Sequence, residues 1–339
     1  MNIALIGLGM VADTHVAAIR TSAQNLNLSC VLGRDAGRTR AFADKIGARV
    51  ADTIEDIAQE TSIDFAIVAT PPNARIEIVR ALAAAGKPVL MEKPVERTLQ
   101  VATEIVELCE AANVPLGIVF QHRARAASIA LKQAIDADVL GDLATVELRI
   151  PWWRDQSYYD APGRGSFGRD GGGVMISQAI HTLDLAAWLV GPIATAQALM
   201  RTTPLHHLEA EDWVGALFEF ENGACGSLMA STAAFPGQAE SIVIQGSKAA
   251  AHLASGVLTL HHLDGRTEEF GANASTGGGA DPIAFTHAWH QSVIEDFAQA
   301  VKNGGSPMAS GRQALHVHAV IDAMERASKT GHRTEVPKT

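Results

Sequence analysis

The chain has 339 residues, of which 47% are hydrophobic and 19% charged, a composition typical of a globular protein with ample core material. It carries 27 basic and 37 acidic residues, and a formal net charge of −10 argues against a nucleic-acid partner. No uninterrupted apolar stretch is long enough to cross a bilayer, and the first residues do not resemble a signal peptide. The three cysteines are scattered without disulfide or zinc spacing, so we expect a cytoplasmic protein without a membrane anchor.

Short apolar runs alternate with helical patterns along the first third of the chain. Strands are predicted at 2–6, 26–32, 65–69, 88–91 and 115–119, and helices at 12–23, 35–46, 73–85 and 98–112. This alternation predicts an α/β fold with a doubly wound parallel sheet.

From about residue 143 the pattern changes to strands joined by short turns, which indicates an antiparallel sheet. These strands are predicted at 195–200, 212–220, 224–230, 241–245 and 257–261, with a hairpin turn at Glu221-Asn222-Gly223. A glycine-rich run at 271–280 predicts a mobile loop, and helices at 288–303 and 311–328 close the chain. We therefore predict two domains, 1–122 and 123–339.

The first strand leads directly into the pattern G-x-G-x-x-A, which is typical of dinucleotide binding. Gly7 permits the tight turn, Gly9 lets a pyrophosphate approach the backbone, and Ala12 keeps the helix close to the sheet. Amides at the start of the helix, at Met10 and Val11, then face the phosphates. Ordinary turn chemistry is the alternative, but the surrounding strand–helix alternation favours a nicotinamide dinucleotide site.

The end of the second strand bears on the choice between NADP and NAD. An acid there accepts hydrogen bonds from a free ribose 2′-hydroxyl, but the sequence reads Gly33-Arg34-Asp35. Gly33 leaves space, and Arg34 offers a planar cation to a 2′-phosphate. This favours NADP(H), with NAD(H) possible if Asp35 takes the acid's place or Arg34 only stacks on the adenine.

Loops at the carboxyl ends of the later strands face the ligand crevice of such a fold. Thr70 and Pro71 follow the strand at 65–69 and are predicted beside the cofactor. Asn73 has two equal interpretations, a cofactor contact or an N-cap for the next helix. After the strand at 115–119, Gln121 or Arg123 is predicted to border the nicotinamide, although Arg123 is also suited to begin a helix.

Glu92-Lys93-Pro94 follows the strand at 88–91, on the same crevice side. With G-x-G-x-x-A, Thr70-Pro71-Pro72, three glycines at 171–173 before His181-Thr182-Leu183-Asp184, and the motif at 307–311, the chain resembles the glucose–fructose oxidoreductase / inositol dehydrogenase / MocA family. The resemblance spans nearly the whole chain. It implies a nicotinamide-dependent dehydrogenase with an N-terminal Rossmann domain and an open-faced, mostly antiparallel C-terminal sheet that is often used for oligomerisation. Too few helices are predicted to cover both faces of that sheet, so we expect a homodimer or homotetramer.

Lys93 and His181 are the predicted catalytic residues. A lysine in a strand-end loop stabilises charge on a reacting oxygen, and a histidine oriented by Asp184 exchanges the hydroxyl proton. Ser177, His181 and Asp184 share one face of a predicted helix at 174–189. Many members of the family carry an aspartate at the position of Ser177, and serine is no carboxylate base at neutral pH. Proton transfer therefore falls on His181 and Lys93, while Ser177 and Asp184 are predicted to contact substrate.

An aromatic segment at 152–160 has the character of a sugar-binding surface. Trp153, Tyr158 and Tyr159 offer flat apolar faces, and Arg154 offers hydrogen bonds to hydroxyls. The alternative is a subunit interface, where the same residue types gather. No histidine cluster has metal-ligand spacing, and hydride transfer needs no metal.

The predicted function is hydride transfer between nicotinamide and a hydroxyl-bearing carbon of a sugar, polyol or related cyclic substrate. Two alternatives stand beside it: a nicotinamide-dependent glycoside hydrolase of the same family, and a non-catalytic NADP-binding sensor.

Overall fold

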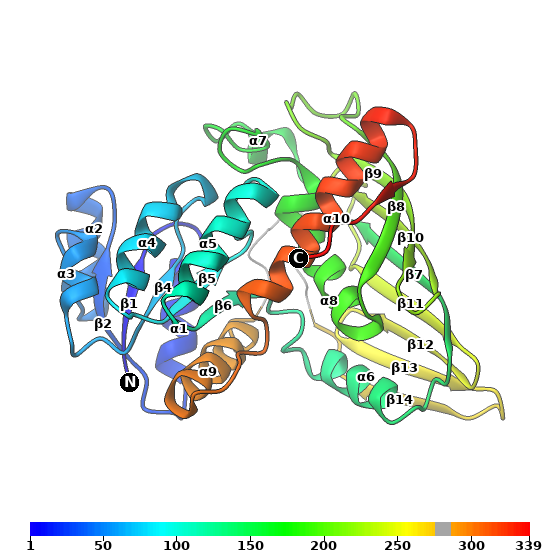
Figure 1. Cartoon of the computed structure of the whole chain (residues 1–339), viewed down its shortest axis with the longest axis horizontal. Coiled ribbons are helices and arrows are strands. Elements are labelled where there is room, and N and C mark those ends of the chain that lie inside the picture. The colour runs from blue at the N-terminus through cyan, green and yellow to red at the C-terminus, as the bar shows by residue number, and fades with distance from the viewer. Residues whose placement is uncertain (275–285) are drawn as a thin grey trace. The chain divides into compact units, whose positions relative to one another are not determined.

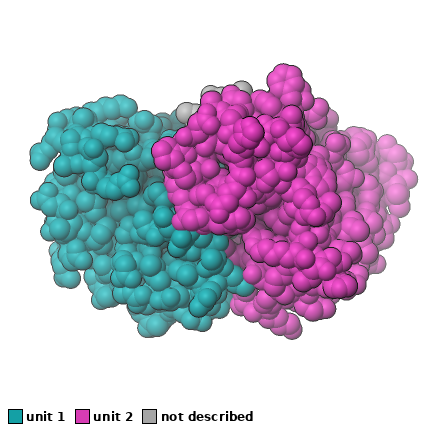
Figure 2. All heavy atoms as spheres, turned by 90° about the horizontal axis from the view of Figure 1, so that it is seen from above, with its two compact units in different colours: residues 1–121, 287–315 teal, residues 122–286, 316–339 magenta. Residues whose placement is uncertain are grey.

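The computed structural model describes residues 1–274 and 286–339, and the predicted loop at 271–280 lies mostly outside them. The chain forms two compact units, coloured separately in Figure 2. Unit 1 comprises residues 1–121 and 287–315, and unit 2 comprises residues 122–286 and 316–339. The predicted division at residue 122 falls within one residue of this boundary, but residues 287–315 return to pack with the first unit rather than the second.

Unit 1 is built on a six-stranded sheet in the order β3-β2-β1-β4-β5-β6, with every pairing parallel. The strands are β1 (Asn2–Ile6), β2 (Asn27–Leu32), β3 (Arg49–Val50), β4 (Phe65–Val68), β5 (Val89–Glu92) and β6 (Leu116–Val119). β4, β5 and β6 are buried along their whole length, as expected for parallel strands covered on both faces. The predicted doubly wound α/β domain is confirmed.

The helices of unit 1 connect and cover these strands (Figure 1). They are α1 (Ala12–Thr21), α2 (Ala36–Ile46), α3 (Ile54–Gln59), α4 (Ile76–Ala84), α5 (Leu99–Ala111) and α9 (Ala288–Asn303). α1 packs against α9, while α3, α4 and α5 pack in succession. The helix predicted at 73–85 begins later: a short 3-10 turn, η1 (Pro72–Ala74), precedes α4, so Asn73 lies inside this turn and is not the N-cap of α4.

Unit 2 is built on a nine-stranded sheet in the order β14-β13-β12-β11-β7-β10-β9-β8-β15. The strands are β7 (Leu143–Pro151), β8 (Ile193–Arg201), β9 (Trp213–Phe220), β10 (Cys225–Ser231), β11 (Ser241–Gly246), β12 (Ala249–Ala254), β13 (Val257–His262), β14 (Thr267–Gly271) and β15 (Thr334–Glu335). Only β7 and β10 pair in parallel, so the predicted mostly antiparallel sheet is confirmed. The predicted hairpin joins β9 to β10, and Gly223 has a φ of +89°, which suits glycine.

Helices α6 (Ala126–Asp136), α8 (Ile180–Val190) and α10 (Gly311–Thr330) pack on one face of this sheet (Figure 1). α6 contacts β12, β13 and β14, and α8 contacts β7. From α10, His316 and Ser328 accept hydrogen bonds from backbone amides of β8. On β9, Phe218 is buried, whereas its neighbour Leu217 is 62% exposed. The strand alternation therefore leaves the opposite face of the sheet open.

Among the described residues, no helix combines the length and the apolar character needed to cross a membrane.

Candidate active site

The turn between β1 and α1 has the geometry that its glycines predict. Gly7 has a φ of +99°, and a Cβ there would lie 2.7 Å from the backbone carbon of Ala69 and the backbone nitrogen of Thr70. A Cβ on Gly9 would meet no described atom within 4 Å, so the backbone there is open to a ligand. Val11 is the N-cap of α1 and makes no side-chain cap hydrogen bond. The turn therefore fits a pyrophosphate, with the exposed Met10 beside it.

Two further residues predicted to contact the cofactor carry buried polar atoms without a partner among the described residues. They are the hydroxyl of Thr70, in the loop after β4, and the side-chain oxygen of Gln121, after β6. Buried polar groups are normally hydrogen-bonded, so such atoms mark places where a bound group completes the site. Both follow the carboxyl ends of parallel strands, where ligands of this fold bind.

The segment after β2 is arranged around Thr39. The Thr39 hydroxyl donates a hydrogen bond to the backbone oxygen of Asp35 at 2.7 Å, and a Cβ on Gly33 would lie 2.5 Å from that hydroxyl. The Asp35 carboxylate accepts a hydrogen bond from the Arg38 amide at 2.8 Å and caps α2. Asp35 therefore already has a structural role, while Arg34 is exposed.

The loop that carries Lys93 is held by a residue that the sequence analysis missed. Arg75, at the start of α4, is 2% exposed, and its guanidinium donates hydrogen bonds to the backbone oxygens of Thr70, Glu92 and Pro94. Burial lowers the pKa of Arg75 to about 10, against the attraction of nearby carboxylates. One buried cation thus ties the loop after β4 to the loop after β5. Arg75 lies two residues after Thr70-Pro71-Pro72-Asn73, which indicates a place near the ligand crevice, but the sequence does not show that its side chain is buried.

The carboxylate of Glu92 is buried between two histidines. Glu92 Oε1 lies 2.9 Å from His15 Nε2 of α1 and 3.5 Å from His290 Nε2 of α9. Burial opposes its ionisation, but hydrogen bonds and charge from both imidazoles outweigh burial and hold the pKa of Glu92 well below its usual range. Burial in turn lowers the pKa of His290, against the attraction of Glu92. The ligand atoms of the three residues lie within 4.8 Å of one another, and the shortest separation is that of a hydrogen bond.

The segment that leads to His181 is not the regular helix predicted at 174–189. Residues Met175–Ala179 form a single π-helical stretch (labelled η2), and α8 begins only at Ile180. The Glu211 carboxylate accepts hydrogen bonds from the amides of Gly173 and Met175 at 3.1 and 3.0 Å. A Cβ on Gly173 would lie 1.8 Å from the Glu211 backbone oxygen, which explains that glycine. The π stretch includes Ser177, so the regular 3.6-residue period assumed between Ser177 and His181 does not apply across it.

Asp184 and Arg123, predicted at the substrate and the nicotinamide, form a buried ion pair within unit 2. Arg123 Nε and Nη2 donate to the two Asp184 oxygens at 2.8 and 2.6 Å, and Asp184 is completely buried. Burial raises the pKa of Asp184, while the cation lowers it. The paired geometry fixes the loop before α6 to α8. Arg123 does not begin α6, which starts at Ala126.

His181 is 4% exposed, and its ring stacks on that of His122, with centroids 4.8 Å apart and planes inclined by 23°. The side chain of Gln178, in the π stretch, donates a 3.3 Å hydrogen bond to the hydroxyl of Tyr158. The sequence analysis named neither His122 nor Gln178 as a partner of the site. Gln178 connects the aromatic segment to the residues just before His181.

The aromatic segment folds around α7 (Gln156–Tyr159). The guanidinium carbons of Arg154 and Arg164 lie 5.5 and 4.2 Å from the centroid of the Tyr158 ring. Tyr159 is buried, and its hydroxyl lies 2.6 Å from the Thr232 hydroxyl; burial raises its pKa. Tyr159 thus has a structural role, whereas Tyr158 and Trp153 keep part of their surface accessible.

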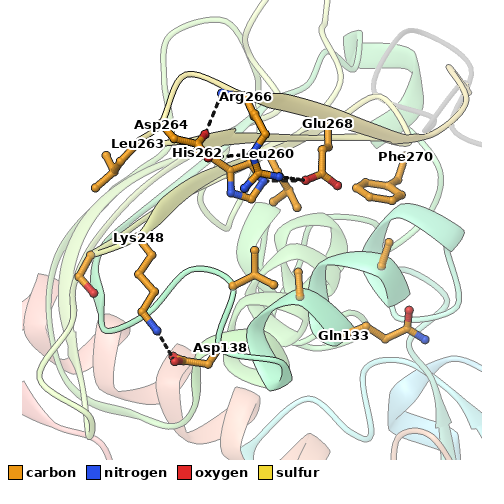
Figure 3. A pocket seen from close by; sticks show the side chains of 14 residues that line it. Gln133, Asp138, Lys248, Leu260, His262, Leu263, Asp264, Arg266, Glu268 and Phe270 are labelled. Atoms are coloured by element: carbon orange, nitrogen blue, oxygen red, sulfur yellow. Dashed lines mark hydrogen bonds and ion pairs between the residues drawn. The ribbon is translucent and has the colours of Figure 1, made fainter.

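A separate groove of about 880 Å³ lies between α6 and the β13–β14 hairpin (Figure 3). Its lining includes the apolar side chains of Leu260 and Phe270. Charged side chains of its lining are paired, Lys248 with Asp138 and Arg266 with Asp264, and His262 Nε2 lies 2.8 Å from Glu268 Oε1. Paired charges offer little to a charged or polyhydroxylated ligand, so the groove is not the candidate active site.

A parallel six-stranded sheet with a dinucleotide turn, joined in one chain to a mixed, mostly antiparallel sheet, is the architecture of a class of nicotinamide-dependent oxidoreductases. Two family models match the chain: "Oxidoreductase family, NAD-binding Rossmann fold" over residues 1–120, and "GFO/IDH/MocA C-terminal domain" over residues 129–252. The chain therefore belongs to the GFO/IDH/MocA oxidoreductase family, which confirms the resemblance found in the sequence.

Named relatives and solved structures support the same assignment. The chain is 25% identical to a D-apiose dehydrogenase of Rhizobium rhizogenes, covering 98% of this chain and 96% of the relative. It is also 25% identical to the scyllo-inositol 2-dehydrogenase (NAD(+)) of Bacillus subtilis, covering 91% and 88%. The WlbA dehydrogenase of Bordetella pertussis, solved with NADH and UDP-GlcNAcA, matches with a TM-score of 0.83, 26% identity, and coverage of 99% and 98%. A levoglucosan dehydrogenase, at 21% identity and a TM-score of 0.88 over the whole of both chains, shares the fold.

Proposed function

We propose that this protein oxidises or reduces one carbon of a sugar, polyol or related cyclic substrate, and that Lys93 and His181 handle the proton. The observation that carries the proposal is the Lys93 loop, which follows β5 in the unit that bears the dinucleotide turn and is fixed by Arg75 and buried Glu92. A loop fixed in this way holds the Lys93 backbone in one place, so less conformational entropy is lost when the lysine meets the substrate. The names of the relatives support the substrate class.

The proposed chemistry divides between the two residues. A bound nicotinamide would supply the hydride acceptor or donor. Lys93 stabilises negative charge on the substrate oxygen as its proton leaves, and the His181 imidazole accepts that proton. Ser177 contributes a hydroxyl hydrogen bond to the substrate. Asp184 keeps α8 in place through Arg123 and has no direct part in proton transfer.

We assign substrate contact to the accessible aromatic surface of Trp153 and Tyr158. The guanidinium groups of Arg154 and Arg164 lie near the Tyr158 ring, and the Tyr158 hydroxyl accepts a hydrogen bond from Gln178, so the ring presents a fixed face. Fixed aromatic faces suit the C–H surface of a sugar ring, and the half-buried guanidinium of Arg164 suits its hydroxyls. Arg154, also predicted to contact substrate, is 2% exposed and donates a hydrogen bond to the backbone oxygen of Trp153.

The test is a panel of sugars, polyols and nucleotide sugars, scanned by nicotinamide absorbance with NAD(H) and with NADP(H). A dehydrogenase accumulates reduced nicotinamide in proportion to product when it oxidises a substrate, and consumes it in the same proportion when it reduces one. The hydrolase alternative would cleave a glycoside while free reduced nicotinamide stays constant. The sensor alternative would bind nucleotide and turn over none of the panel. Either of these two results would contradict the proposal.

For the cofactor, we propose a preference for NADP(H), supported by the exposed Arg34 and by the absence of an acid at Gly33. Relatives were solved with NADH, so the preference is a distinct claim about this chain. A Gly33→Asp change would force a Cβ against Thr39 and confound the test. Arg34→Gln is cleaner: we expect NADP(H) affinity to fall about tenfold or more while NAD(H) affinity is kept. Arg40→Gln, at an exposed position farther along α2, is the control, and tighter NAD(H) than NADP(H) binding by the unaltered protein would contradict the preference.

For assembly, we propose a homodimer or homotetramer formed through the open face of the unit 2 sheet. Leu217 on β9 and Leu199 on β8 are exposed there, and Gln197 pairs with Leu217 in register. Leu228 lies on the covered face instead. Leu217→Lys should lower the mass measured by light scattering toward that of one chain, while Leu263→Lys, at an exposed position beside the groove, should not. A single-chain mass for the unaltered protein would contradict this proposal.

A further inference from the structure

The loop that joins β8 to β9 contacts the aromatic segment through a buried histidine. His206 is 4% exposed, and its Nε2 lies 2.8 Å from the backbone oxygen of Arg154. Its ring also contacts two rings of the segment, with centroid distances of 5.8 Å to Trp153 and 5.1 Å to Tyr159. One side chain of this loop therefore contacts both the backbone and the rings of the segment to which we assign substrate contact.

Both ring nitrogens of His206 face hydrogen-bond acceptors. Nδ1 lies 2.7 Å from Oδ2 of Asp212, just before β9, and Nε2 faces the carbonyl oxygen of Arg154. The Asp212 carboxylate also accepts hydrogen bonds from the amide and the hydroxyl of Thr203, both at 2.7 Å, which stabilise its ionised form. A neutral imidazole has one N–H group and can donate to one of these acceptors only. Two acceptors require two N–H groups, which the imidazolium form carries.

The charges near the ring favour the same protonation state. Asp212 is completely buried, and in the described part of the chain His206 is the only basic side chain within ion-pair distance of its carboxylate. The carboxylate of Asp155, the N-cap of α7, also interacts with the charge of His206. The Arg154 guanidinium carbon lies 5.5 Å from the centroid of the Tyr158 ring, whereas the backbone of Arg154 faces His206. A buried carboxylate needs a counter-charge, and the imidazolium supplies it.

We propose that His206 is a positioning residue: as a buried imidazolium, it bridges Asp212 to the Arg154 backbone and holds the aromatic segment in the shape that receives substrate. This inference rests on the proposed contact of Trp153 and Tyr158 with substrate. Charge-assisted hydrogen bonds are stronger than neutral ones, so an imidazolium restrains the segment more firmly than a neutral ring does. Core packing alone is the competing explanation, and it predicts that any flat ring at position 206 serves as well.

The direct test observes the His206 ring by NMR in full-length protein labelled on histidine nitrogens, with its signals assigned by their loss in His206→Gln. At neutral pH, both ring nitrogens should have the chemical shifts of protonated nitrogens. In Asp212→Asn, whose amide group can donate to Nδ1, the ring should become neutral, with one nitrogen of each kind. A neutral ring in the unaltered protein, or an unchanged ring in Asp212→Asn, would overturn the inference. This readout needs no turnover, so it stands apart from a failure of the proposed function.

Kinetics test the positioning role. His206→Ala removes both hydrogen bonds and should raise KM about tenfold, with kcat and nucleotide affinity each within about twofold of the unaltered enzyme. His206→Gln, which keeps a donor for the Arg154 oxygen, should recover part of KM, whereas His206→Phe, which keeps only a flat ring, should not. The matched control is His207→Ala. Its exposed neighbouring residue donates a 2.8 Å hydrogen bond to the Gln156 side chain through its backbone amide, so neither constant should change.

Two kinetic results would overturn the positioning role: a normal KM in His206→Phe, or a fall in kcat with unchanged KM in His206→Ala. If His206→Phe does not fold, the double variant His206→Phe with Asp212→Leu removes the buried carboxylate as well, and the same raised KM is expected.

Discussion

The two segments that carry Lys93 and His181 each bury a carboxylate, and they treat it differently. Glu92, beside Lys93, is surrounded by the imidazoles of His15 and His290, and its pKa is held well below the usual range. Glu211, which caps the segment before His181, accepts hydrogen bonds from two backbone amides, yet burial raises its pKa to about 7. Burial opposes charge at both sites. Imidazoles that can carry positive charge overcome burial, whereas two neutral amides do not.

The same contrast applies to the cations. In the Lys93 loop, Arg75 donates to backbone oxygens of Thr70, Glu92 and Pro94, so one cation binds several neutral dipoles. Beside α8, Arg123 faces the Asp184 carboxylate through two hydrogen bonds. Unit 1 therefore positions its loop through the backbone, and unit 2 positions its helix through ion pairs. Removing one member of a buried ion pair leaves the other charge unpaired. We expect this change to lower the free energy of unfolding the most.

The first prediction concerns that ion pair. Asp184→Asn leaves Arg123 buried without a counter-charge and should lower the free energy of unfolding by roughly 3–5 kcal/mol. The control is Asp322→Asn, which removes an exposed partner of Arg326 and should cost less than about 1 kcal/mol. The double variant Arg123→Met with Asp184→Leu removes both charges and should be clearly more stable than Asp184→Asn. Urea denaturation measures all of these variants, and equal losses in Asp184→Asn and Asp322→Asn would contradict the account.

The second prediction concerns Arg75. Arg75→Met leaves buried backbone oxygens without their donor, and it should lower the free energy of unfolding by roughly 2–4 kcal/mol. Because the Lys93 loop loses its anchor, kcat should fall about 10²-fold, more than KM rises. Arg80→Met, on the same helix but paired with Glu104 at the surface, is the matched control and should change both quantities little. Equal kinetics in the two variants would show that Arg75 does not position the loop.

The third prediction uses the two carboxylates directly. The pKa of Glu211 is about 7 in the fold and 4.5 in an unfolded chain, so the fold favours its protonated form. Its stability contribution is present below the unfolded pKa and is lost as pH rises through the folded value. From about pH 5 to about pH 8, the unaltered protein should lose roughly 1–3 kcal/mol relative to Glu211→Gln.

Glu92 should behave in the opposite way. Its pKa is lowered in the fold, so its contribution is present above the unfolded pKa and is lost only as pH falls through the folded value. Below its unfolded pKa of 4.5, the unaltered protein should therefore lose stability relative to Glu92→Gln as pH falls, whereas Glu211 costs stability as pH rises. Thermal unfolding midpoints measured across pH test the pair, and parallel slopes for the two variants would contradict the contrast between them.

Local pattern predicted most of the fold. The helix expected at 288–303 is α9, and the hairpin after β9 lies where its Asn-Gly turn places it, because periodicity and turn chemistry act over a few residues. The β12 and β14 strands were missed, since alanine-rich and charged segments carry weak strand signals. The sequence predicted Gly7 and Gly9 in the dinucleotide turn from their spacing together with the strand–helix alternation around them.

The site needed contacts that no local pattern contains. The π stretch before His181 is capped by Glu211, which is 36 residues from Met175 along the chain. Asp184 is paired with Arg123, 61 residues away, a partner that its spacing on the predicted helix did not indicate. In the sequence, Arg75 is one more polar residue near the start of a helix, and only the structure shows that it is buried. Long-range pairing and burial depend on the assembled fold, and motif spacing does not encode them.

The central claim is that Lys93 and His181 act on the substrate proton while other residues hold the cofactor. The most direct measurement is a single-turnover experiment with a substrate found by the panel, together with nucleotide binding by fluorescence titration. Lys93→Met and His181→Ala should each slow the single-turnover rate by about 10²–10⁴-fold and leave nucleotide affinity within about twofold, whereas Lys45→Met, a surface change in unit 1, should alter neither. Loss of nucleotide affinity with a normal single-turnover rate would contradict the claim.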